Sequence, residues 1–162
     1  MNKLGIFESN LGHNGHFLDT IELSDTIKEA TLTLNWDLLD SEFKKLTTRG
    51  GDLFKYLNQY SDFNSIEFII SIRDSENEWE EDGIWHDDGS RVLAFSLSLM
   101  TEPTSVEGGV LEIRKRGQLE SIKIPPFNFG EIVVFLTGTS GYEHKINAVT
   151  KGIRIIIAGW CS

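Results

Sequence analysis

The chain has 162 residues, of which 25 are Asp or Glu and 15 are Lys or Arg, so its formal net charge is -10 at pH 7. This charge repels a polyphosphate backbone and the basic residues are scattered along the chain, so we expect no nucleic-acid partner. Because no apolar run approaches the roughly 20 residues that a membrane span needs, we also expect no membrane partner.

The length is typical of one domain, and no linker or internal repeat divides the sequence, so we expect a single domain over residues 1–162. Within it, residues 1–64 should hold an N-terminal strand and helices, and residues 65–162 a β-rich core. The first residues lack the apolar core of a secretory signal. Cys161 is the only cysteine, so no intrachain disulfide can form. We therefore expect a cytoplasmic protein in which this thiol has no special role.

The N-terminal part predicts one extended segment and two helices. The extended segment covers residues 15–23. In residues 36–46, apolar side chains recur at spacings of three and four, which places them on one face of an amphipathic helix. Residues 47–51 break this pattern, and Asp52 is expected to cap the second helix.

After Ser65 the sequence becomes a series of short β-type runs separated by turn signals such as Gly108-Gly109 and Pro125-Pro126. Eight such runs are the number that a jelly roll needs. The predicted fold is therefore mainly β, a jelly roll with the N-terminal helices packed on one sheet. The runs are 66–73, 83–88, 91–100, 109–115, 119–124, 131–136, 142–148 and 153–160.

Alternation within residues 91–100 separates two faces. One carries small side chains such as Ala94 and Ser96, and the other carries large apolar ones such as Phe95 and Leu97. This pattern suits a strand that lines a cavity on one side and packs into a core on the other.

Two of the four histidines lie in informative places within the β-region. His86 and Asp88 are separated by one residue, and in extended chain such side chains project to the same face. His144 follows 56 residues after Asp88, where a neighbouring strand would supply a third ligand. Two imidazoles and one carboxylate on one face of an octahedron are the ligands that non-haem Fe(II) oxygenases use. We expect His86, Asp88 and His144 to form a catalytic metal site.

Arg154 lies ten residues after His144, on the last predicted strand. A turn at Lys151-Gly152 is expected to pair strands 142–148 and 153–160, which would bring Arg154 beside the metal-bearing face. An arginine that points into a barrel is an unpaired buried charge unless a carboxylate meets it, and guanidinium binds carboxylate through two parallel hydrogen bonds. We expect Arg154 to bind a dicarboxylate.

These residues and the motifs around them resemble the prolyl 4-hydroxylase-type 2-oxoglutarate/Fe(II) dioxygenases over about residues 66–160. The resemblance implies a double-stranded β-helix in which His86, Asp88 and His144 bind Fe(II) and Arg154 pairs with the distal carboxylate of 2-oxoglutarate. The motifs that carry it are Trp85-His86-Asp87-Asp88-Gly89, residues 91–100, Gly108-Gly109-Val110-Leu111, residues 130–135, residues 144–149 and residues 152–160.

The activity that this resemblance implies couples oxidative decarboxylation of 2-oxoglutarate by dioxygen to hydroxylation of an aliphatic carbon, with ascorbate as an optional reductant. The substrate would be a small molecule, an amino acid or a protein side chain. Related halogenases lack the carboxylate that Asp88 supplies, so its presence favours hydroxylation or demethylation.

The sequence departs from the family pattern at three positions. Ile156, two residues after Arg154, stands where relatives often have a hydroxyl residue, so a second hydrogen bond to the cosubstrate must come from elsewhere. Asn147 replaces a common proline after the distal histidine. Arg73 stands roughly where some relatives have a tyrosine that touches the cosubstrate, and the sequence assigns it no role.

Several side chains near the motifs allow two interpretations. Arg73 and Arg91 could enter the pocket, although ion pairing or solvation is the favoured interpretation for each. Trp85 and Tyr142 flank ligands and could either pack in the core or line the pocket. Alternation predicts that Asp87 faces outward.

Two polar stretches are interpreted as loops. Residues 74–82 are strongly acidic and are favoured as a solvated loop, with a lid whose Trp79 touches substrate as the alternative. His13 and His16 stand close together, but no third ligand accompanies them, so a flexible loop is expected rather than a metal site.

Other functional classes remain as alternatives. The nucleic-acid dealkylating branch of the family is disfavoured, because it carries a second arginine six residues after the first, where this chain has Trp160. A cupin-like metal-binding jelly roll is suggested faintly by residues 141–144, although the His-x-His of cupins is absent. The last alternative is a non-catalytic binding module. The sequence specifies neither the substrate nor the oligomeric state.

Overall fold

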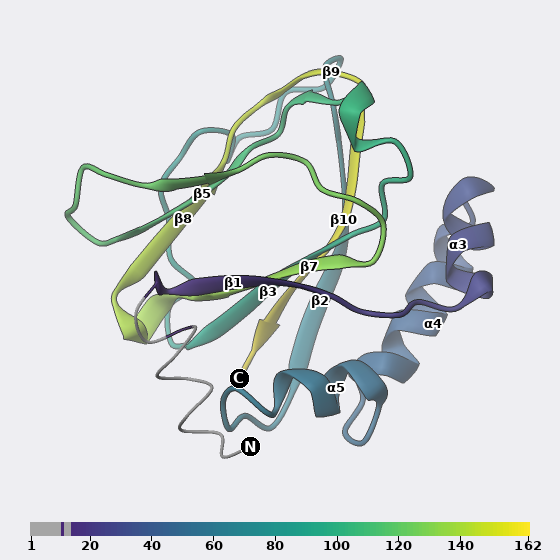
Figure 1. Cartoon of the computed structure of the whole chain (residues 1–162), viewed down its shortest axis with the longest axis horizontal. Helices are drawn as coiled ribbons and strands as arrows, with labels where there is room; N and C mark the ends of the chain where they lie inside the picture. Colours follow the sequence, from purple (N-terminus) through teal and green to yellow (C-terminus); the bar gives the residue numbers. More distant parts are fainter. Residues whose placement is uncertain (1–10, 12–13) are drawn as a thin grey trace.

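Two antiparallel β-sheets face each other in the computed structural model, which describes Leu11 and residues 14–162 (Figure 1). The larger sheet has the spatial order β1-β7-β3-β10-β2, and the smaller one β6-β5-β8, with β4 and β9 forming a further pair. This arrangement confirms the predicted mainly β fold. The strands are β1 (His16–Thr20), β2 (Ile66–Asp74), β3 (Leu93–Ser98), β4 (Glu107–Gly108), β5 (Leu111–Lys115), β6 (Ile122–Ile124), β7 (Glu131–Leu136), β8 (Tyr142–Ile146), β9 (Val149–Lys151) and β10 (Ile153–Cys161).

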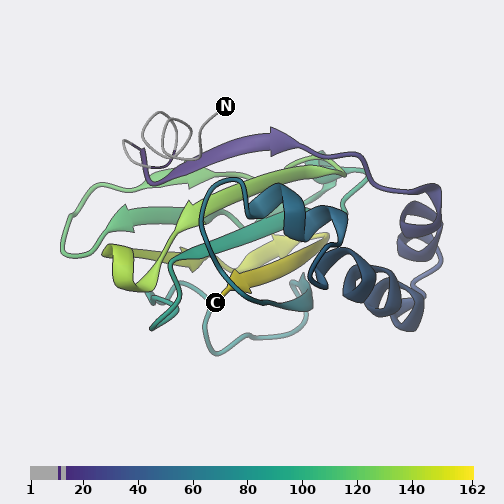
Figure 2. The same ribbon diagram turned by 90° about the horizontal axis from the view of Figure 1, so that it is seen from below.

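The helices lie together beside the larger sheet (Figures 1 and 2). Helix α4 confirms the predicted amphipathic helix, whereas α3 was not predicted; the Oγ of Ser24 caps it by accepting the backbone N–H of Ile27. The predicted cap at Asp52 was wrong, because Gly51 holds the N-cap position of α5 and Asp52 is its first helical residue. The helical elements are α3 (Asp25–Leu32), α4 (Trp36–Thr47), α5 (Asp52–Leu57) and the 3₁₀ turns η2 (Pro103–Ser105) and η3 (Gly138–Ser140).

Strand β2 separates the helices from the interior. On one face, the ring of Phe68 lies 6.1 Å from the ring of Phe43 in α4. On the other face, Ile69, Ser71 and Arg73 line a cavity between the sheets, as the alternation of a strand requires. The helices thus cover the outer face of the larger sheet, as predicted, and the inner face remains for a site.

Two predicted features of the sheets were wrong. Residues 83–88 do not form a strand, and they meet β8 through an isolated bridge between His86 and His144 and a hydrogen bond from the N–H of Gly83 to the carbonyl of Ile146. Strands β8 and β10 do not pair with each other, since β8 pairs with β5 while β10 lies between β2 and β3. The reason is that Val149–Lys151, at and just before the turn expected at Lys151-Gly152, form β9 and pair with β4, so the chain crosses to the larger sheet before β10 begins.

The N-terminal strand joins the larger sheet at its edge, because β1 pairs with β7 over residues 16–20. His16 therefore lies in a strand rather than in the predicted loop, and its Nδ1 is 3.0 Å from the carbonyl oxygen of Asn14. His13 lies outside the described residues.

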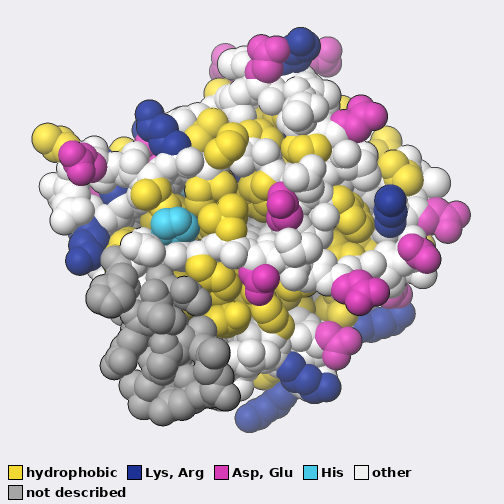
Figure 3. Space-filling model, viewed as in Figure 1, with side chains coloured by type: hydrophobic (Ala, Val, Ile, Leu, Met, Phe, Trp, Pro, Cys, Tyr) yellow, Lys and Arg dark blue, Asp and Glu magenta, His cyan; other side chains and the backbone are white. Residues whose placement is uncertain are grey.

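On the face shown in Figure 3, Lys and Arg side chains lie at several places around the edge, with Asp and Glu side chains between them. In the described part of the chain, no helix has both the length and the apolar character needed to cross a bilayer. The single domain and the cytoplasmic location expected from the sequence stay predictions.

Candidate active site

His86, Asp88 and His144 meet beside the cavity between the sheets. One nitrogen or oxygen from each lies within 4.8 Å of those from the other two. His144 Nε2 is 3.8 Å from Asp88 Oδ2, which is too far for a hydrogen bond. Within the described residues, these three form the one group of His, Cys, Asp and Glu side chains close enough to share a metal ion. The structure thus brings together the three residues that the sequence singled out.

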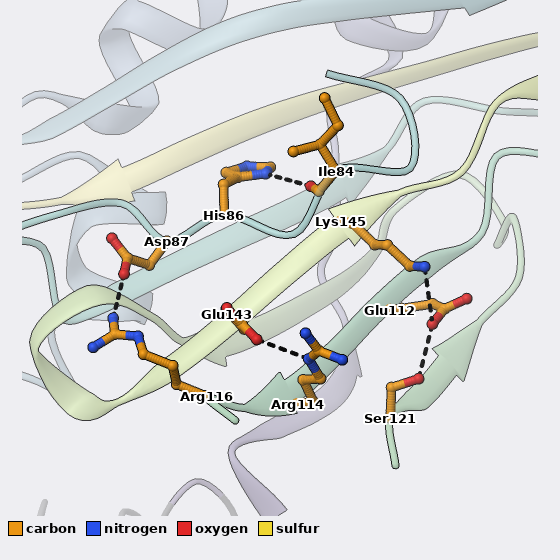
Figure 4. A network of polar contacts seen from close by, with 9 residues as sticks. All are labelled: Ile84, His86, Asp87, Glu112, Arg114, Arg116, Ser121, Glu143 and Lys145. Atoms are coloured by element: carbon orange, nitrogen blue, oxygen red, sulfur yellow. Dashed lines mark hydrogen bonds and ion pairs between the residues drawn. The ribbon is translucent and has the colours of Figure 1, made fainter. Parts of the chain in front are cut away.

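Backbone pairing sets the two histidines side by side. The N–H of His86 donates to the carbonyl of His144 at 3.0 Å, and the N–H of His144 donates to the carbonyl of His86 at 2.9 Å. Between His86 and Asp88 in the sequence, Asp87 points away and pairs with Arg116 (Figure 4). Asp88 consequently returns to the side of His86.

Both imidazoles present a nitrogen suited to a metal. His86 Nδ1 lies 3.0 Å from the carbonyl oxygen of Ile84 (Figure 4), so the tautomer that donates this hydrogen bond keeps a lone pair on Nε2. Burial lowers the pKa of His144 to about 4, with the charge of Asp88 opposing the shift and that of His86 adding to it. His144 is therefore neutral near pH 7, which is the form that binds metals.

One oxygen of the Asp88 carboxylate lacks a hydrogen-bond partner. Its Oδ2 is buried and makes no hydrogen bond within the described structure, a costly arrangement unless a cation or a donor meets it. Its backbone N–H donates to Oγ1 of Thr137 at 3.2 Å, and Thr137 is fully buried. Thr137 was not predicted as a site residue, because it lies between the predicted strands 131–136 and 142–148, in a segment interpreted only as a turn.

Arg154 reaches the site from the larger sheet, opposite the sheet that carries His144. Arg154 is only 1% exposed, and none of its three guanidinium nitrogens has a hydrogen-bond partner among the described residues. Burial lowers the pKa of Arg154 to about 9, with Arg73 lowering it further and Asp82 opposing. The group is still a cation near pH 7. Because a buried cation without a partner is costly, Arg154 indicates an anionic ligand.

One cavity of about 270 Å³ joins these groups, since His86, His144 and Arg154 all line it. Ala94 and Ser96 also line it, which confirms the predicted small face of β3. Much of the remaining lining is apolar. A concave, largely apolar space with a few converging polar groups is typical of a small-ligand site.

An open cleft of about 730 Å³ adjoins the cavity. Glu81, His86 and Trp160 line both spaces, and Asp88 lines the cleft. Arg91 stands at the same cleft, where it pairs with Glu67 and lies 5.7 Å from the ring of Trp160. The cleft therefore gives a larger molecule access to His86 and Asp88, two of the three candidate ligands.

The acidic stretch 74–82 matches the favoured interpretation as a solvated loop over most of its length, and its alternative role as a lid stays a prediction. It is exposed over most of its length, yet Glu81 lines both the cavity and the cleft. Asp82 pairs with Arg73, whose guanidinium lies 5.3 Å from the ring of Trp79. Arg73 is thus ion-paired and also lines the cavity.

Trp85 lies in neither of the two places that the sequence suggested. Its ring stacks on the outer side of the smaller sheet, 3.8 Å from the guanidinium of Arg114 and 4.8 Å from the ammonium of Lys145. Arg114 also pairs with Glu143 at 2.8 Å (Figure 4). Alternation with the inward-facing His86 explains this outward position. Tyr142, in contrast, packs in the core.

Sequence comparison places this site in a family. Residues 73–162 match the family described as the 2OG-Fe(II) oxygenase superfamily. The chain belongs to this superfamily. A PKHD-type hydroxylase from a Synechococcus species is 35% identical over 95 residues, which cover 57% of this chain and 40% of that protein. A PKHD-type hydroxylase from Hyphomonas neptunium is 37% identical over 68 residues, which cover 42% of this chain and 27% of that protein. The matches thus span less than half the length of these relatives.

Solved structures of the superfamily share the fold. A prolyl-4-hydroxylase from Pseudomonas putida aligns with a TM-score of 0.63 at 17% identity, over 99% of this chain and 91% of that one. A prolyl 4-hydroxylase from Phytophthora capsici aligns with a TM-score of 0.63 at 14% identity, over 93% and 59%. The comparisons confirm the predicted family and its double-stranded β-helix.

Proposed function

We propose that this member of the superfamily is an Fe(II)- and 2-oxoglutarate-dependent hydroxylase, in which His86, Asp88 and His144 bind the iron and Arg154 binds the distal carboxylate of 2-oxoglutarate. The observation that carries the proposal is the buried guanidinium of Arg154, which has no partner in the described structure and lines the same cavity as His86 and His144. A ligand with a carboxylate at one end and a metal-binding 2-oxo acid at the other satisfies both groups. 2-Oxoglutarate is such a ligand.

The donor set fits Fe(II). Two imidazoles and the carboxylate of Asp88, whose Oδ2 has no hydrogen-bond partner among the described residues, form the facial set that non-haem iron oxygenases use. Three ligands leave positions for cosubstrate and dioxygen. Fe(II), when bound with these reactants, supplies the oxidising chemistry. The chain's own share is to hold the three donors, to orient the cosubstrate through Arg154, and to exclude water from a largely apolar cavity.

We further propose that the substrate enters through the open cleft and is hydroxylated on an aliphatic carbon. The names of the relatives support this reaction, since they are PKHD-type hydroxylases and prolyl 4-hydroxylases. A small molecule, an amino acid and a protein side chain all fit an open cleft of this size. The net charge of -10 speaks against a nucleic-acid substrate.

The test is the visible absorption of the protein with Fe(II) and 2-oxoglutarate under anaerobic conditions. A 2-oxo acid that binds Fe(II) through two oxygens gives a weak metal-to-ligand charge-transfer band, which we expect for the unaltered protein. His144→Ala should lose both the band and iron binding, because it removes one of three donors. Arg154→Gln should keep iron binding but should need far more 2-oxoglutarate to produce the band.

His16→Ala is the matched control, because His16 lies on β1 outside the cavity and the cleft. It should leave the band unchanged. Absence of the band from the unaltered protein would count against the proposal. A protein that binds the metal but does not bind 2-oxoglutarate would instead favour a cupin-like or non-catalytic jelly roll. A screen for substrate-stimulated succinate release over amino acids, peptides and small metabolites then identifies the substrate.

A further inference from the structure

A second arginine faces Arg154 inside the cavity. Arg73 on β2 and Arg154 on β10 are direct register partners across the antiparallel pair. Such partners project from the same face of a sheet, with Cβ atoms about 5 Å apart. Both side chains accordingly line the 270 Å³ cavity. The two charges also repel each other, since the charge of Arg73 contributes to the lowered pKa of Arg154.

Two like charges directly opposite each other destabilise a sheet. Only one carboxylate in the described structure relieves the pair: Asp82 binds Nη1 of Arg73. Arg154 has no partner, and Nε of Arg73 is also buried without one. Glu81 also lines the cavity but forms no ion pair with either guanidinium among the described residues, so all three guanidinium nitrogens of Arg154 and Nε of Arg73 keep unused N–H donors there.

These donors match a carboxylate rather than a neutral group. A carboxylate has two oxygens that accept up to about four hydrogen bonds, so it can meet Arg154 and the free N–H of Arg73 together. Ile156, the residue two after Arg154, offers no hydrogen bond from its side chain. A second contact must come from elsewhere in the cavity, and Arg73 on β2 is the other arginine that lines it.

We propose that Arg73 is a second anchor for the distal carboxylate of 2-oxoglutarate, and that it makes the cavity selective for a dicarboxylate over a 2-oxo acid with a single carboxylate. This inference rests on the proposed function. It assigns Arg73 a role in cosubstrate specificity in addition to its ion pair with Asp82.

A purely structural role for Arg73 is the competing explanation, because the ion pair with Asp82 and the contact with Trp79 also tie the acidic stretch to β2. The chain contains a matched control for this role. Arg114 likewise pairs with a carboxylate, Glu143, and stacks on a tryptophan, Trp85, but it lies on the outer side of the smaller sheet. Loss of Arg114 therefore removes comparable contacts without touching the cavity.

The experiment measures ligand binding by isothermal titration calorimetry, with Mn²⁺ in place of iron so that no turnover occurs. The ligands are 2-oxoglutarate and 2-oxopentanoate, which has the same carbon chain without the distal carboxylate. Arg73→Gln should weaken 2-oxoglutarate by about tenfold or more, as the loss of a hydrogen bond to a charged group predicts. It should leave the affinity for 2-oxopentanoate unchanged. Arg114→Gln should change neither.

A second variant and a second donor complete the test. Arg73→Lys keeps a positive charge that can pair with Asp82, so it should lower the affinity for 2-oxoglutarate less than Arg73→Gln does. If thermal melting without ligand shows that Arg73→Gln does not fold, Arg73→Lys is compared with the unaltered protein instead. Ser71 also lines the cavity from β2. Selective loss of 2-oxoglutarate affinity in Ser71→Ala but not in the Arg73 variants would transfer the role to Ser71 and overturn the proposal.

The remaining outcomes are decisive in other ways. Equal weakening of both ligands by Arg73→Gln would show that Arg73 only shapes the cavity, and unchanged binding of both would show that it has no role; either result overturns the inference but not the proposed function. If the unaltered protein binds neither 2-oxo acid, the proposed function fails and this inference fails with it.

Discussion

The side chain of Arg154 passes directly beside Gly109, so that a Cβ added to this glycine would lie 2.8 Å from Cδ of Arg154. Gly109 also has a φ of 63°, a conformation that other residues adopt only with strain. Gly109→Ala should therefore displace Arg154 within the cavity. We expect the dissociation constant for 2-oxoglutarate, measured by calorimetry on the Mn²⁺-loaded protein, to rise by about tenfold, while the affinity for Mn²⁺ stays the same.

Gly117→Ala separates the displacement from the backbone strain. Gly117 has a similar φ of 82°, but an added Cβ there would meet nothing within 4 Å. Gly117→Ala should lose about 1 kcal/mol of unfolding free energy, since it places a side chain at positive φ. Gly109→Ala should lose at least as much, because its Cβ would also lie 3.1 Å from Cγ2 of Val149. Only Gly109→Ala should lose cosubstrate affinity. Equal losses of affinity in the two variants would contradict the proposed placement of Arg154.

Thr137 is expected to act as a positioning residue for Asp88. Thr137→Val keeps the shape of the side chain but removes the Oγ1 that accepts the backbone N–H of Asp88. Because groups that orient metal ligands typically contribute about tenfold to a hundredfold in metal affinity, we expect weaker Fe(II) binding of that order in an anaerobic competition titration. Thr139→Val, at an exposed position of the same turn, should bind Fe(II) normally. Normal binding by both variants would remove Thr137 from the site.

The sequence was sufficient to predict the residues that meet in the site, because their identification depends on local rules. Alternation along an extended chain places His86 and Asp88 on one side and Trp85 and Asp87 on the other. The chemical cost of a buried, unpaired guanidinium likewise holds for Arg154 whichever strand lies beside it. The resemblance to the family then predicted 2-oxoglutarate as the ligand, and the series of short strands predicted the fold.

The route by which Arg154 enters the site could not be predicted in the same way. It depends on β9 pairing with β4 over Gly108, a contact between segments about 40 residues apart. The facing pair of Arg73 and Arg154 depends on the register between β2 and β10, which no local pattern encodes. Thr137 was missed for the same reason, since its partner Asp88 lies in a distant loop.

Trp85 should contribute to stability rather than to the site. Its ring contacts the charged groups of Arg114 and Lys145 on the outer side of the smaller sheet. Trp85→Leu removes both cation–π contacts, each worth about 0.5 to 1 kcal/mol at an accessible position, so the free energy of unfolding in urea should fall by roughly 1 to 2 kcal/mol. Mn²⁺ affinity should not change, because the neighbouring His86 faces the other way. A loss of metal affinity with unchanged stability would contradict this assignment.

Cys161 should resist modification as long as β10 stays paired. The residue is 3% exposed, it lies between Ile66 and Leu93 in the larger sheet, and burial raises the pKa of its thiol to about 12. Since only the thiolate reacts, about one molecule in ten thousand is reactive near pH 8, against roughly a quarter for an ordinary thiol. Reaction with a disulfide reagent should therefore be at least about a hundredfold slower in the folded protein than in guanidinium chloride. Its rate should keep rising with pH from about 7 to about 10, because a raised pKa moves ionisation above this range. A fast reaction that levels off near the ordinary thiol pKa would instead show that the end of β10 opens to solvent.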